Sequence, residues 1–194
     1  MSFKQRNVMN IKHWIAVTIF LFSNALHAKQ VNIEDNYPYE FARSLYVGKK
    51  RVFLKIDDSY QLVAHDITEN HRTMGFVREK EDINTWKQYV NVVINVNTDK
   101  ASSTRIKEVQ DYIERTYDRV EILDNNVDRY NDGTQHASTS IAYTDENGEQ
   151  IVTSVKYISD QSSLIGVQVS RKVASLSRDR KKAEKMVESV LTIK

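Results

Sequence analysis

The chain has no cysteine, one proline and five glycines among its 194 residues. Without thiols it has no cysteine nucleophile, disulfide, iron–sulfur cluster or cysteine-ligated zinc site, and no residue that would carry the lipid of a lipoprotein. The glycines form neither a G-x-G-x-x-G pattern nor a P-loop, which excludes the common nucleotide-phosphate loops. A domain built from this chain therefore has to be held together by packing alone.

A basic excess is also lacking once the first 28 residues are set aside. The full chain carries 28 basic and 26 acidic residues, but Lys4, Arg6 and Lys12 lie in that segment and no acidic residue does. The remainder has 25 basic residues against 26 acidic ones. Because nucleic-acid binding needs many neutralised phosphates, no nucleic-acid partner is expected.

Residues 1–28 have the three parts of a secretory signal peptide. A basic start is followed by an apolar run over residues 14–22 and then by small residues that include Ala25 and Ala28. A membrane-spanning helix needs about 20 apolar residues, and this run has about half of that. We expect cleavage after Ala25 or Ala28, which leaves no transmembrane span; the alternative is an uncleaved N-terminal anchor. The protein is therefore expected in the periplasm, or secreted, in a Gram-negative bacterium.

Alternation of apolar and polar residues predicts most of the domain to be β-structure. Strands are predicted at about residues 52–56, 60–64, 74–77, 86–96, 120–122, 139–144, 150–158 and 164–169. Asn147-Gly148 between two of them predicts a type I′ hairpin turn. Residues 29–45 are predicted to be a loosely docked, aromatic-rich lead-in, and residues 46–194 one domain.

Two stretches change to a helical period. Residues 103–118 carry an apolar stripe that begins at Ile106, with Ser102 or Ser103 as the expected cap, and residues 177–193 form the second amphipathic helix. The expected fold class is α+β, a largely antiparallel sheet of about six to eight strands with these two helices covering it.

This order of elements is similar to the architecture shared by PsbP, Mog1 and the envelope protein DcrB. Gly75-Phe76-Val77, followed by Asp82, Asn84-Thr85-Trp86 and a β-rich run, resembles small exported proteobacterial proteins of unknown function. The resemblance implies a PsbP/Mog1-like fold, whose members bind partners more often than they catalyse. It implies no catalytic residue.

No pattern in the chain indicates catalysis, a metal or a cofactor. Asp124, Asn126, Asp128 and Asp132 have the spacing of calcium-loop ligands, but Arg129 and Gln135 stand where the loop requires glycine and glutamate. We interpret the segment as a polar strand and turn. His65, His71 and His136 form no i, i+4 pair, and no serine lies in an acylating motif.

Basic residues gather before and within the last predicted helix: Arg171, Lys172, Arg178, Arg180, Lys181, Lys182 and Lys185. They form either a solvated helix face or a docking patch for an acidic partner or an anionic lipid surface. Cations near a helix N-terminus oppose the helix dipole, and such conflicts sometimes mark functional surfaces.

Aromatic residues gather in the lead-in, at Tyr37, Tyr39 and Phe41. This segment either docks on the edge of its own sheet or inserts into a partner.

These observations favour a non-enzymatic, exported protein-binding module, with a protein partner in the cell envelope, as an accessory part of an envelope or secretion assembly. A small-ligand or lipid carrier is the first alternative and predicts an apolar pocket between the sheet and the helices. A hydrolase is the second and predicts a tight Asp/Glu/His cluster in a cleft.

Overall fold

The computed structural model describes residues 29–30 and 41–194. The predicted signal peptide, Tyr37 and Tyr39 lie outside the described residues. Phe41 is the first residue of a strand, so the ordered domain includes residues 41–45, which the sequence analysis assigned to the lead-in.

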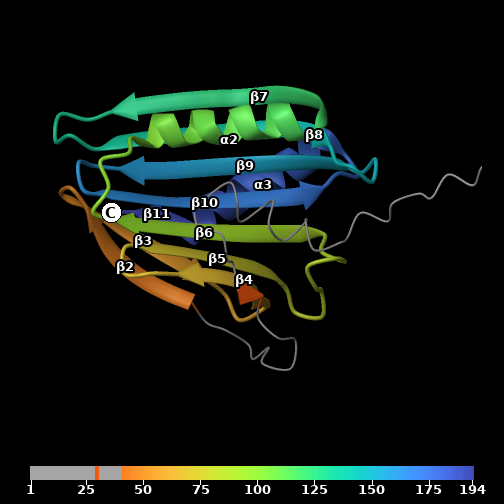
Figure 1. Ribbon diagram of the computed structural model, residues 1–194, viewed down its shortest axis with the longest axis horizontal. Coiled ribbons are helices and arrows are strands. Elements are labelled where there is room, and N and C mark those ends of the chain that lie inside the picture. Colours follow the sequence, from red (N-terminus) through yellow and green to blue (C-terminus); the bar gives the residue numbers. More distant parts are fainter. Residues whose placement is uncertain (1–28, 31–40) are drawn as a thin grey trace, which may run out of the picture.

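Eleven strands and two helices make up the described part of the chain (Figure 1). In chain order they are β1 (Lys29–Gln30), β2 (Phe41–Val47), β3 (Lys50–Ile56), β4 (Tyr60–Ile67), β5 (His71–Arg78), β6 (Gln88–Val96), α2 (Ser102–Thr116), β7 (Asp118–Arg129), β8 (Gln135–Thr144), β9 (Gln150–Ser159), β10 (Ser163–Lys172), α3 (Leu176–Val190) and β11 (Leu191–Ile193). Neither of these helices is long and apolar enough to cross a bilayer.

Eight strands form the main sheet, in the order β1-β4-β5-β6-β10-β9-β8-β7. Every pairing is antiparallel, and β6 joins the two halves of the sheet by pairing with β10, which is far from it in the sequence. The expected fold class, a largely antiparallel α+β sheet with two amphipathic helices, is confirmed. The strand predicted at residues 86–96 is β6, in which residues 88–94 are all buried, as in a central strand that is covered on both faces.

A second sheet, in the order β11-β3-β2, was not expected from the sequence. β3 was predicted, but it pairs with β2 from the lead-in and with β11, which follows α3 directly. The last helix therefore ends at Val190 and not at residue 193. Thr192 and Ile193 extend into β11 because backbone pairing with Phe53 and Val52 replaces the last helical turn.

The two helices cover opposite faces of the main sheet, with α2 in front of it and α3 behind it in Figure 1. The stripe of α2, with Ile106, Val109 and Ile113, is buried against one face. α3 and the small sheet share the other face, where the buried residues include Val187 and Leu54. A three-layer arrangement results, with an apolar core on each side of the sheet.

The β8–β9 hairpin forms where it was predicted, but its turn differs. Gly148 has φ of +77°, whereas Asn147 keeps a negative φ, so the predicted type I′ turn is wrong. Asp145 organises a longer loop instead, since its carboxylate accepts the N–H groups of Asn147 and Glu149.

The start of α2 also differs from the prediction. Ala101 is the N-cap and no side chain caps the first turn from within the helix. Ser102 is buried, its N–H donates to Ser159 Oγ at 2.7 Å, and its hydroxyl donates to the Gln135 carbonyl at 3.1 Å. Acceptors on neighbouring strands thus satisfy free N–H groups at the start of the helix. A local sequence pattern does not reveal such contacts.

Candidate functional site

The predicted basic residues surround α3, and the structure divides them into two groups. α3 buries Ala183, Val187 and Val190 against the main sheet and turns its opposite side to solvent. Some of the basic side chains reach sideways to carboxylates, and the others project outward. This division decides which of them are available to a partner.

Arg171 and Lys172, at the end of β10, belong to the first group. Arg171 lies 3.7 Å from the Asp179 carboxylate and also donates to Gln88, while Lys172 lies 2.6 Å from Glu149. These contacts tie the end of β10 to neighbouring elements. Both residues are thus paired within the molecule, and their part in a docking patch stays a prediction.

Asp179 anchors the start of α3. It is 3% exposed, and its Oδ2 accepts the N–H groups of Ala174 and Ser175 at 2.9 Å each. These two backbone hydrogen bonds, with the charges of Arg178 and Arg171, hold the pKa of this carboxyl below its ordinary value despite burial. The negative charge also offsets the unfavourable placement of cations near the helix N-terminus.

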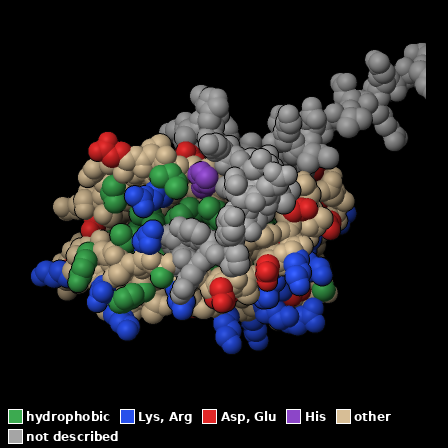
Figure 2. Space-filling model, turned by 90° about the horizontal axis from the view of Figure 1, so that it is seen from below, with side chains coloured by type: hydrophobic (Ala, Val, Ile, Leu, Met, Phe, Trp, Pro, Cys, Tyr) green, Lys and Arg blue, Asp and Glu red, His purple; other side chains and the backbone are tan. Residues whose placement is uncertain are grey.

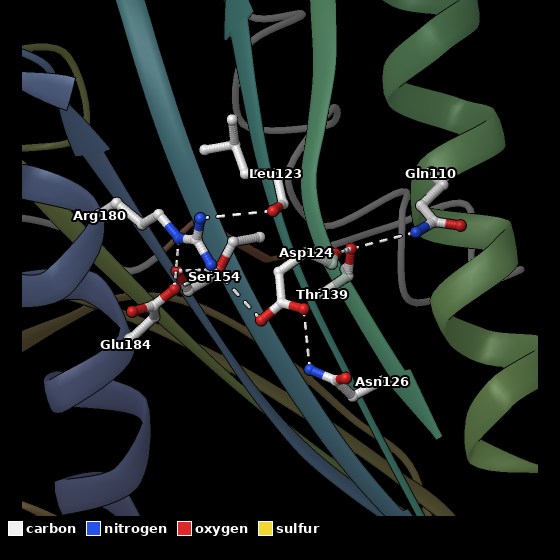
Figure 3. Close-up of polar contacts among 9 residues, drawn as sticks. Gln110, Leu123, Asp124, Asn126, Thr139, Ser154, Arg180 and Glu184 are labelled. Carbon is white, nitrogen blue, oxygen red and sulfur yellow. Dashed lines mark hydrogen bonds and ion pairs between the residues drawn. The ribbon is translucent and has the colours of Figure 1, made fainter. Parts of the chain in front are cut away.

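Arg180 clamps α3 to the edge of the main sheet. Its Nε donates to Glu184 at 2.6 Å, and its terminal nitrogens reach the Leu123 carbonyl at 3.3 Å and Asp124 at 3.4 Å (Figure 3). The guanidinium side chain is 31% exposed and contacts acceptors on both α3 and β7. The sequence alone placed Arg180 among the docking residues because its partner Asp124 on β7 is 56 positions away in the chain.

The remaining cations form a stripe along the exposed side of α3, made up of Arg178, Lys181, Lys182 and Lys185 and called here the α3 stripe. Their spacing of three, one and three residues places them on one helix face. Arg178 is 58% exposed and lies 3.7 Å from Asp179, which Arg171 shares. Within the described residues, the three lysines form no ion pair.

An open crevice of about 210 Å³ lies between α3 and strands β7–β9. Its lining residues are Asp124, Ser138, Thr139, Ser140, Ser154, Val155, Lys156, Glu184, Val187 and Glu188. Figure 3 shows Ser154, Asp124 and Glu184 converging on the Arg180 side of this space. Most of its lining residues are polar or charged, so it differs from the apolar pocket expected of a lipid carrier.

The charged groups of the crevice form ion pairs with one another. Lys156 lies 2.7 Å from Glu188, and Arg180 bridges Glu184 and Asp124. Ser140 Oγ donates to Glu184 at 3.1 Å and lies 3.0 Å from Ser154 Oγ. A serine nucleophile needs a base oriented toward it and donors for the oxyanion, and the lining includes no histidine. The crevice therefore presents hydroxyl and carboxylate groups that are suited to hydrogen bonding.

The calcium-like segment adopts the strand and turn expected of it. Asp124, Asn126 and Asp128 lie in β7, and Asp132 accepts from the Thr134 backbone and hydroxyl in the following turn. A strand extends these side chains over the sheet edge, so they cannot converge as loop ligands do. Across residues 29–30 and 41–194, no group of His, Cys, Asp and Glu side chains is arranged to hold a metal ion.

The side chains of His65, His71 and His136 do not form one cluster. His71 lies 3.9 Å from Asp66 and accepts or donates to Thr73 and Asn95, whereas His65 pairs with Met74 in the register of β4 and β5 and projects to the other face. The His136 ring lies tilted against Tyr130, with 4.5 Å between ring centroids, on β8 in the other half of the sheet.

The fold defines the class of protein as an α+β sandwich, with an antiparallel sheet between two helical layers. A comparison with protein-family models and with curated proteins found no match. Among solved structures, the chain is similar to the cyanobacterial PsbP protein CyanoP from Synechocystis sp. PCC 6803. The alignment has a TM-score of 0.50 and 10% identity, and covers 84% of this chain and 98% of that one. At this identity the likeness shows a PsbP-like fold and nothing about activity.

Proposed function

We propose that the protein is a non-enzymatic, exported binding module of the bacterial cell envelope that docks an acidic protein partner through the α3 stripe. The proposal rests on the exposed position of Lys181, Lys182 and Lys185. They stand side by side on the exposed face of a helix whose other face is buried, and they form no ion pair with a described residue.

The stripe is unfavourable for the isolated protein. Like charges three or four residues apart destabilise a helix by about 0.2–0.5 kcal/mol per pair. Arg178–Lys181, Arg178–Lys182, Lys181–Lys185 and Lys182–Lys185 are all such pairs. An acidic partner surface would relieve this repulsion, and charge complementarity of this kind speeds association and selects partners.

Export is supported by the sequence features of residues 1–28, and a protein without cysteine needs no oxidative folding outside the cytoplasm. A role as an accessory part of an envelope or secretion assembly follows from the combination of export with a docking surface. The PsbP-like fold is compatible with such a role and does not select it.

The rival functions receive less support from the packing. A carrier needs an apolar cavity between sheet and helix, but the side chains there form two continuous cores, one beneath α2 and one beneath α3 and the small sheet. A hydrolase needs a base beside its nucleophile; Glu184, which accepts from Ser140, is also held by Arg180 in an ion pair of 2.6 Å, which weakens it as a base.

The test is crosslinking in the native host, followed by affinity capture of the tagged protein at low and high salt. The decisive variant carries Lys181→Glu, Lys182→Glu and Lys185→Glu. We expect stoichiometric envelope proteins to co-purify with the wild type, to be weakened by salt and to be lost with this variant, because exposed charge pairs are screened.

The matched control carries Lys87→Glu, Lys107→Glu and Arg115→Glu, three exposed cations that lie away from α3. It changes the net charge by the same amount and should retain the partner. Capture of the protein alone, or equal loss of the partner in both variants, would overturn the proposed docking surface.

A further inference from the structure

The small sheet differs from the chain as a whole in the balance of its basic and acidic residues. Its three strands, the turn between β2 and β3 and the terminal Lys194 contain no aspartate or glutamate. The same segments contain six basic residues: Arg43, Lys49, Lys50, Arg51, Lys55 and Lys194. In a chain with 28 basic and 26 acidic residues, this is a strongly one-sided distribution.

Alternation along β3 gives the small sheet one apolar and one basic side. Val52, Leu54 and Ile56 are buried against the main sheet, so Arg51 and Phe53 point to the outer side. The Arg51 guanidinium lies 4.7 Å from the Phe53 ring centroid, and Lys194 Nζ lies 5.2 Å from it. Two cations therefore flank one aromatic ring, an arrangement that cation–π attraction stabilises.

Tyr46 extends this surface onto the neighbouring strand. It is the register partner of Arg51 in the β2–β3 ladder and is 67% exposed. Arg51 donates to the Ser44 hydroxyl at 2.7 Å, and neither Arg51 nor Lys194 forms an ion pair with a carboxylate side chain of the described residues. We call Tyr46, Arg51, Phe53 and Lys194 the basic sheet face.

The basic sheet face and the α3 stripe belong to the same layer. The small sheet and α3 contribute Leu54 and Val187 to one core on the same side of the main sheet, so both turn their outer surfaces away from it. Figure 2 shows the molecule from the side of the small sheet, with Lys and Arg side chains gathered along one border.

We propose that the basic sheet face binds the surface of an anionic phospholipid bilayer. Three short strands present an open surface on which the cations are spread, which matches a plane of lipid phosphates. Tyr46 and Phe53 supply the aromatic rings that favour the boundary between headgroups and acyl chains. This inference goes beyond the proposed function, because the small sheet and not α3 makes the contact; a partner docked on the α3 stripe would then lie at the membrane.

The experiment is co-sedimentation of the purified protein with phosphatidylcholine vesicles that either contain or lack phosphatidylglycerol. We expect binding only to the anionic vesicles and its loss at high salt. Arg51→Glu with Lys194→Glu should lower the affinity about tenfold or more, since each cation near an anionic surface contributes to binding. Lys107→Glu with Arg115→Glu on α2, with the same charge change on the opposite layer, should leave binding within about twofold.

Three results would overturn the inference. Equal binding to both kinds of vesicle would indicate insertion of an apolar segment instead of recognition of charge. Equal loss in the two double variants would indicate a response to net charge alone. Retained binding in the Arg51→Glu, Lys194→Glu variant would place any lipid contact elsewhere. Capture of the partner with wild-type efficiency by that variant separates this inference from the proposed function, which depends on the α3 stripe.

Discussion

Arg180 of α3 and Asp124 of β7 lie 3.4 Å apart across the open side of the crevice, although they are 56 positions apart in the chain. The contact fastens the last helix to the outermost strand of the main sheet, and Glu184 holds the same guanidinium from within the helix. An arginine that looked like part of a docking patch is thereby a structural clamp.

Arg180→Ala is expected to lower the free energy of unfolding by about 1 kcal/mol, because the side chains of this network are about one third exposed and solvent weakens their attraction. Urea denaturation measures the change. Lys181→Ala, one residue away on the exposed face, should change stability by less than about 0.5 kcal/mol. An Arg180→Ala, Asp124→Ala double variant that shows additive losses would contradict a direct coupling between the two residues.

Gly166→Ala is expected to destabilise the protein by about 1–3 kcal/mol or more, because a Cβ there would overlap the buried ring of Tyr157 on the neighbouring strand. Thermal and urea unfolding report the loss. Tyr157→Ala removes the obstruction, so Gly166→Ala added to Tyr157→Ala should cost much less than it does alone. Equal costs in the two backgrounds would show that the ring is not the cause.

His136 is expected to make stability fall as the pH decreases below about 6.5. Burial lowers the pKa of its imidazole, as do the charges of Lys50 and Lys156, against the opposing influence of Asp128 and Asp132. The unfolded chain takes up this proton at higher pH than the folded chain, so acidification favours unfolding. The penalty begins at the ordinary pKa of 6.5 and is complete below the lowered folded pKa.

The measurement for His136 is the melting temperature across a pH series from about 8 to 5, the range in which an imidazole titrates. His136→Gln cannot take up the proton and should flatten the profile between pH 6.5 and the folded pKa of the wild type. An unchanged slope in this variant would assign the pH dependence to other groups.

Asp179→Asn is expected to cost about 1 kcal/mol, typical of a lost helix-start interaction, because the neutral amide is a weaker acceptor for the N–H groups of Ala174 and Ser175. The lowered pKa of Asp179 adds stability that is present above its ordinary value of 3.8 and is lost as the pH falls through the folded pKa. The variant should therefore unfold with less sensitivity to acid. Glu114→Gln, at an exposed position of α2, is the control; a similar loss there would contradict a specific role for Asp179.

Local patterns in the chain were sufficient to locate most of the elements. The stripe of Ile106, Val109 and Ile113 predicted α2, and period-two alternation predicted the strands from β3 to β10, because helical and extended backbones repeat their faces at 3.6 and two residues. The absence of cysteine likewise needed no structure to exclude thiol chemistry.

Contacts between distant segments decided the rest. β2 and β11 exist as strands because each pairs with β3, at sequence separations that no local pattern records. The same is true of the basic residues, which look alike in the chain. Folding gave Arg171, Lys172 and Arg180 carboxylate partners and left Lys181, Lys182 and Lys185 facing solvent. Whether a charge is paired depends on which carboxylate folding brings within a few ångströms of it, and that is a property of the packed layers.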